Sequence, residues 1–168
     1  KELSGDLAEA VDLYQEAGLP DEAARVLLLR ADAEPSAEKR IALFSLAAYT
    51  ATGEELKKKA RGRKALVSFD VLRGRGGSFM KSEVLAVARE LEEAGELEPA
   101  ADAFALAGDA ESEVRVLTAA GAIERLEDRL RVSESTARTE RDLEITLRKL
   151  ADLDRTAERR AALELAMT

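Results

Sequence analysis

The sequence contains no cysteine, histidine or tryptophan, and only three prolines interrupt its 168 residues. The absence of cysteine excludes disulfides and thiol nucleophiles and favours a cytoplasmic location. The absence of histidine excludes His-dependent triads and His-based zinc sites. Carboxylate pairs such as Glu92 and Glu93 are present, but adjacent residues on a helix diverge by about 100° and no pattern places them in a buried site. We therefore expect no enzymatic activity, no metal and no cofactor.

Long apolar runs and an export segment are also absent. The apolar runs are only a few residues long, whereas a membrane helix needs about 20, so we expect no membrane partner. Aromatic residues make up 4% of the chain and apolar residues 46%, with alanine, leucine, glutamate and arginine prominent. This composition favours a folded all-α protein. Because Lys1 is not an initiator methionine and a helix is still running at Leu165, we expect the chain to be part of a longer protein.

A thirteen-residue cassette recurs along the chain, opening at a glycine and carrying a large apolar residue nine positions later. The glycines are Gly5, Gly18, Gly95, Gly108 and Gly121, and the apolar residues are Tyr14, Leu27, Phe104, Leu117 and Leu130. The sixth position is apolar in four cassettes (Val11, Ala24, Ala101 and Val114) and fails only at Glu127. Thirteen residues provide about three helical turns plus a glycine that ends the helix. The five large apolar residues should therefore be buried between stacked helices.

About ten helices are predicted from this spacing and from the proline and glycine positions. The first spans 5–17, the second begins at Pro20, the third spans 35–51, and Thr52 with Glu55 forms a capping box for the fourth. The next four span 81–94, 97–107, 110–120 and 122–132, and a longer terminal pair spans 137–153 and 155–167, with Leu143, Leu147 and Leu150 on one face.

The predicted fold is an all-α, right-handed α-solenoid of short antiparallel hairpins, closed by the longer C-terminal pair as a cap. Residues 1–168 form a single repeat domain with four sub-parts. These are N-terminal hairpins (1–52), a long basic helix with a mobile glycine-rich turn (53–80), the thirteen-residue repeats (81–132) and the terminal pair (133–168).

The repeat resembles the tetratricopeptide-like superfamily of helical hairpins, which has an aromatic or leucine residue three positions before Ala-Gly at a helix end. The matching positions are Tyr14 with Ala17-Gly18, Leu91 with Ala94-Gly95, Phe104 with Ala107-Gly108 and Leu117 with Ala120-Gly121. Two cassettes make 26 residues rather than the family's 34, and the family's tryptophan and closing proline are missing. The resemblance covers residues 5–31 and 82–132 and implies a scaffold. More faintly, residues 64–95 resemble helical regions that precede phosphopeptide-binding forkhead-associated domains in bacterial proteins.

The second informative feature is a basic stretch within an acidic chain of net charge −8. Residues 56–81 carry nine basic side chains against the single acidic Asp70, a net charge of +8. The nine are Lys57, Lys58, Lys59, Arg61, Arg63, Lys64, Arg73, Arg75 and Lys81. They could form a positive face for an acidic partner, or they could solvate a helix and pair with neighbouring acidic helices.

This region allows two further interpretations. Gly74-Arg75-Gly76-Gly77-Ser78 could aim backbone N–H groups at an anion, but it lacks the Gly-Lys-Ser/Thr ending of a P-loop and is more simply a turn between helices. Nucleic-acid binding would need stacking aromatics, and the nearby Phe69 and Phe79 lie at positions that periodicity buries.

We therefore expect a non-enzymatic protein-interaction scaffold that docks an acidic segment, from a partner or from the same protein, on the basic stretch 57–81. One alternative is a structural spacer that positions a neighbouring domain. A second is nucleic-acid or anion binding through the basic stretch.

Overall fold

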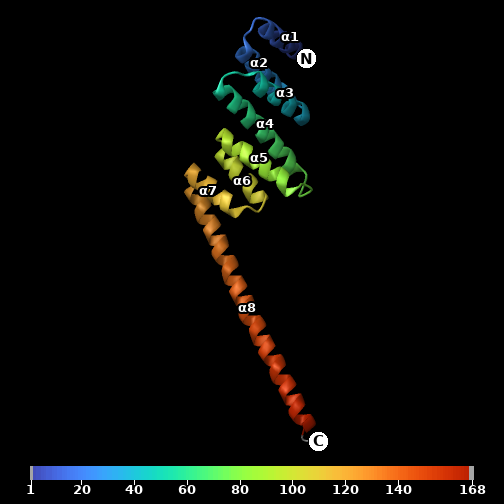
Figure 1. Ribbon diagram of the computed structural model, residues 1–168, viewed down its shortest axis with the longest axis vertical. Helices are drawn as coiled ribbons and strands as arrows, with labels where there is room; N and C mark the ends of the chain where they lie inside the picture. The colour runs from blue at the N-terminus through green and yellow to red at the C-terminus, as the bar shows by residue number, and fades with distance from the viewer. Residues whose placement is uncertain (1, 167–168) are drawn as a thin grey trace. The chain divides into compact units, whose positions relative to one another are not determined.

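The computed structural model describes residues 2–166, and within that range the side chains of all residues except 2–5, 150, 153, 154, 157 and 162–166. Eight helices and no strands occupy these residues. They are α1 (Glu2–Glu16), α2 (Pro20–Ala33), α3 (Ala37–Thr50), α4 (Glu54–Gly74), α5 (Lys81–Ala94), α6 (Leu97–Leu106), α7 (Ala110–Ala120) and α8 (Ile123–Ala166), as labelled in Figure 1. The all-α prediction is confirmed.

The chain divides into two units, residues 1–122 and 123–168. In the first unit each helix from α1 to α7 packs against the next one in sequence, and α2 also contacts α4. The second unit consists of α8. The boundary predicted at 132/133 lies inside α8.

The predicted C-terminal pair is wrong, because the described part of the chain from Ile123 to Ala166 is one 44-residue helix. Within Ile123–Ala166, the segments predicted at 122–132, 137–153 and 155–167 are joined in α8, and residue 167 lies outside the described residues. No glycine or proline follows Gly121 in the sequence, so no residue type that ends a helix separates them. Leu143 and Leu147 are exposed, and the side chain of Leu150 lies outside the described ones.

Glycines end the cassette helices as predicted. Gly18, Gly95, Gly108 and Gly121 have φ values of 69°, 86°, 70° and 68°, in the left-handed region. The backbone N–H after each glycine donates to the carbonyl five residues earlier, on Tyr14, Leu91, Phe104 or Leu117, at N···O distances of 2.9–3.0 Å. This is the Schellman arrangement. The residue four positions before each of these glycines is therefore the one whose carbonyl accepts the bond that ends the helix.

Burial follows the cassette at three of its five large apolar positions. Leu27, Phe104 and Leu117 are buried, with at most 2% of their surface exposed. Tyr14 is 37% exposed and Leu130 64% exposed, so the prediction is wrong for these two. Leu130 lies on α8, which has no second helix within its own unit to cover it. Tyr14 lies on α1, the first helix of the array, which has a sequence neighbour on only one side.

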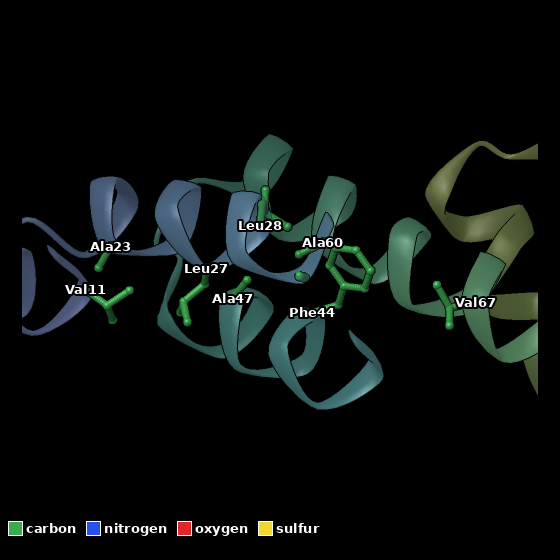
Figure 2. Packing of buried hydrophobic residues seen from close by; sticks show 9 residues of the cluster. Val11, Ala23, Leu27, Leu28, Phe44, Ala47, Ala60 and Val67 are labelled. Carbon is green, nitrogen blue, oxygen red and sulfur yellow. The ribbon is translucent and has the colours of Figure 1, made fainter. Parts of the chain in front are cut away.

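The N-terminal helices share one hydrophobic cluster. Val11 of α1, Leu27 of α2, Phe44 of α3 and Ala60 of α4 belong to it, and Figure 2 shows these side chains along the interior of the four helices. Fully burying a side chain of this size contributes about 1.5–3 kcal/mol. The cluster therefore holds α1 to α4 together.

The long helix α4 packs on both sides rather than separating two halves. Ala60 and Val67, seven residues apart, belong to the N-terminal cluster with α2 and α3. Gly62, about 200° around the helix from Ala60, faces α5, because a Cβ placed there would lie 3.0 Å from the Cβ of Ala94. The predicted long helix is confirmed, and it packs against the helices before it and the helix after it.

Asp21 connects the start of α2 to the start of α4. Its Oδ1 accepts hydrogen bonds from Thr52 N at 2.7 Å, Thr52 Oγ1 at 2.9 Å and Gly53 N at 3.2 Å. These bonds, led by that from the Thr52 backbone, lower the pKa of the Asp21 carboxyl. The predicted Thr52–Glu55 capping box is therefore wrong, since Gly53 is the N-cap of α4 and the Thr52 hydroxyl is engaged by Asp21.

Candidate partner-binding site

The nine basic residues lie around α4 and the turn that follows it. Seven of them are on α4, Arg75 is in the turn, and Lys81 is the first residue of α5. Arg61 and Arg63 point about 200° apart, because successive helical residues are separated by about 100°. The stretch therefore surrounds a helix and does not form one positive face.

Four of the nine are paired with carboxylates. The N–O distances are 2.8 Å for Lys57–Glu54, 2.6 Å for Arg63–Asp32, 2.9 Å for Lys64–Glu90 and 3.8 Å for Arg75–Glu83. The partner carboxylates belong to α2, α4 and α5. For Arg63, Lys64 and Arg75, the arrangement is the one expected of cations that pair with neighbouring acidic helices, whereas Lys57 pairs within α4.

Two others act on single neighbours. The Arg73 guanidinium lies 5.6 Å from the ring centre of Phe69, within cation–π range. Lys81 contributes to lowering the pKa of Asp109, the N-cap of α7, although hydrogen bonds from Ser112 are the larger cause. Both arrangements stabilise local structure.

The remaining basic residues of α4 are divided between two clefts. Lys58 and Arg61 line a cleft of about 220 Å³ between α4 and α5, together with Glu54, Glu55, Glu90, Glu93 and Ala94. Four carboxylates and two cations give this lining a net charge of −2. An acidic ligand would be repelled there.

Lys59 lies on the opposite side of α4, in a cleft of about 310 Å³ between α2 and α4. We call this the α2/α4 cleft; its lining residues are Arg25, Leu28, Leu29, Asp32, Leu56, Lys59 and Arg63. Three cations and one carboxylate give it a net charge of +2, and three leucines supply apolar surface. Of these two clefts, it is the one whose charge suits an acidic ligand.

Sequence reasoning missed four residues of the α2/α4 cleft. Arg25, Leu28, Leu29 and Leu56 lie outside the charge pattern that identified the basic stretch. The spacing of 25, 28, 29 and 32 shows that these α2 residues share a helical face. No local pattern shows that this face meets α4, whose lining residues lie about 30 positions later.

The glycine-rich turn does not form an anion cradle. The backbone N–H groups of Arg75, Gly76 and Ser78 donate to the carbonyls of Leu72, Arg73 and Arg75 at 3.1, 3.3 and 3.2 Å. These amides are therefore engaged within the turn. Residues 74–78 are exposed and connect α4 to α5, as a turn between helices does.

Within the described residues, no group of three or more histidine, cysteine, aspartate or glutamate side chains is placed to hold a metal ion. None of the described helices combines the length and apolar character needed to cross a membrane. No family model matches the chain, and no curated protein and no solved structure matches it significantly.

Proposed function

We propose that this chain is a non-enzymatic, cytoplasmic protein-interaction scaffold that docks an acidic segment of a partner, or of the same protein, beside α4. Its first unit would be a right-handed α-solenoid related to tetratricopeptide-like hairpins. The sequential packing of α1 to α7 and the glycine-terminated helices support this architecture. The observation that carries the docking proposal is the α2/α4 cleft, an open concave site with net charge +2 on a chain of net charge −8.

Binding of short peptides tests the docking function. A fluorescein-labelled peptide rich in glutamate should bind the full chain in fluorescence anisotropy, and a lysine-rich peptide of equal length should not. Affinity should fall between 25 and 150 mM salt, because exposed charges are screened beyond about 8 Å at physiological ionic strength. Equal binding of both peptides, or none of the acidic one, would contradict the proposal.

Charge reversal locates the interaction. The double substitution K58E/K59E, which alters both clefts along α4, should weaken binding of the acidic peptide. The control R138E/R141E makes the same charge change at exposed positions of α8. It should leave affinity within about twofold, because neither arginine lines either cleft and exposed charges away from a binding contact contribute little. Similar losses in both variants would show that only net charge matters.

A spacer function is supported by a separate observation, the length of α8. Forty-four helical residues extend about 66 Å, and the described side chains of α8 are exposed or half-buried. Because the chain has no cysteine, spin labels at S133C and R160C would be unique. A rigid spacer predicts a narrow distance distribution near 40 Å, and a broad distribution would contradict it.

A further inference from the structure

The floor of the α2/α4 cleft is apolar and continues into the protein core. Leu28 is buried and belongs to the N-terminal cluster, and Leu56 packs against that cluster. Leu29 is 58% exposed at the cleft. Leu29 and the half-buried Leu56 present apolar surface that water contacts in the unbound chain. Covering it would contribute about 25 cal/mol per Å² removed from water.

The rim is cationic, and its charges remain accessible. The side chains of Arg25 and Arg63 are 60% and 44% exposed, and each forms one ion pair, Arg25 with Glu22 and Arg63 with Asp32. Lys59 forms no ion pair with a described residue. Arg63 uses its Nη1 on Oδ1 of Asp32, while a guanidinium offers five N–H donors. Exposed pairs of this kind contribute only about 0–1 kcal/mol, so an incoming carboxylate can share these donors.

From this floor and rim, we infer that the α2/α4 cleft takes an acidic amphipathic segment, one that inserts a leucine-like side chain against Leu29 and Leu56 and sets carboxylates on Arg25, Lys59 and Arg63. The inference rests on the proposed docking function and narrows it to one cleft and one class of ligand. The amphipathic character follows from the lining, since a purely acidic segment would leave the apolar surface of Leu29 and Leu56 in contact with water.

Three peptide probes test the ligand class on the full chain. The first is a glutamate-rich peptide with leucines at the i, i+3, i+4 and i+7 positions of a helix. The second replaces its leucines with serine, and the third replaces its glutamates with lysine. The first should bind roughly tenfold or more tightly than the second, since one buried apolar contact can contribute 10- to 200-fold. The third should not bind.

Two matched pairs of variants test the location. L29E should weaken binding of the first probe roughly tenfold or more, while L13E, at a leucine of nearly equal exposure on α1, should not. K59E should weaken it roughly fivefold. The neighbouring K58E, which lines the α4/α5 cleft, should leave it unchanged. Circular dichroism of each variant confirms that the chain is folded.

The outcomes separate this inference from the proposed function. If the first and second probes bind equally and L29E has no effect, the inferred contact of a leucine-like side chain with Leu29 and Leu56 is wrong, while docking of an acidic segment is still supported. If K58E weakens binding and K59E does not, the site is the α4/α5 cleft and the inference is overturned. If neither acidic probe binds, the proposed function fails as well.

Discussion

Phe104 and Leu117 each stabilise the first unit in two ways. Their side chains are buried, with 2% and 1% of their surface exposed. Their carbonyl oxygens accept the hydrogen bonds that close α6 and α7, from Asp109 N and Ala122 N. The residue whose side chain packs in the core is therefore also the residue whose carbonyl accepts the bond that ends the helix. The point at which each helix ends is in this way tied to the position of its buried side chain.

Truncating the large apolar residue at the cassette's ninth position should lower stability where that residue is buried and not where it is exposed. Phe104→Ala should lower the free energy of unfolding by about 3–5 kcal/mol, since it removes a large buried side chain and leaves a cavity. Leu130→Ala, at the same cassette position but 64% exposed, should change it by no more than about 0.5 kcal/mol. Urea denaturation followed by circular dichroism measures both. Equal losses would show that Leu130 is covered in solution.

At the scale of elements, α4 is the helix on which both sides of the first unit depend. It packs against α3 and α5, and it contacts α2 where the cationic cleft lies. It lies close to α5 at Gly62, which is buried and lacks the side chain that would otherwise hold the helices apart. A glycine costs a helix interior up to about 1 kcal/mol, and close packing offsets this cost.

Adding a side chain at Gly62 should therefore destabilise the protein. Gly62→Val would place its Cβ 3.0 Å from that of Ala94, and overpacking of this kind costs about 1–3 kcal/mol. Gly74→Val is the control, because no atom lies within 4 Å of a Cβ there. It should change the unfolding free energy by no more than about 0.5 kcal/mol. If both variants unfold alike in urea, α4 and α5 are not in close contact at this point.

The turn between α4 and α5 should be the first site of tryptic cleavage. Residues 73–78 are exposed, and Gly76 and Gly77 have positive φ, so the backbone around Arg75 lies outside a helix. Proteases cut such segments before they cut helices. Limited trypsin digestion with mass spectrometry should give a first cut after Arg73 or Arg75. Earlier cleavage within α5, or within α4 before Arg73, would contradict this.

For the whole molecule, four carboxyl groups link stability to pH. Hydrogen bonds from Thr52, Lys57, Arg115 and Ser112, respectively, lower the pKa values of Asp21, Glu54, Glu92 and Asp109. A carboxyl group with a lowered folded-state pKa stabilises the fold above its unfolded-state value, and this contribution is lost as the pH falls through the folded-state value. Neither histidine nor cysteine is present to titrate near neutral pH.

The melting temperature should therefore be nearly constant from about pH 5.5 to 8 and should fall below about pH 4. Asp21→Asn should lower it at pH 7 and reduce the size of the acid-dependent fall, because the carboxylate that accepts the Thr52 and Gly53 hydrogen bonds is removed. Asp12→Asn, at an exposed position of α1, is the control. An unchanged pH profile in D21N would show that this carboxylate does not contribute.

The sequence by itself determined the local structure. Glycines in the left-handed region end α1, α5, α6 and α7, Pro20 begins α2, and cassette spacing identified Leu27, Phe104 and Leu117 as core residues. These features depend on neighbouring residues, so periodicity and turn chemistry reveal them. The sequence also shows that no glycine or proline follows Gly121, and α8 accordingly continues as one helix.

Only the tertiary structure decided which charges meet and which apolar residues are covered. Asp21 engages Thr52, Arg63 pairs with Asp32, and Leu29 shares a cleft with Lys59, all across about 30 residues of chain. The sequence showed nine basic residues close together along the chain. In the folded protein, those on α4 lie on different sides of the helix, and several of the nine pair with carboxylates. Contacts of this kind depend on how the helices pack, which no local pattern encodes.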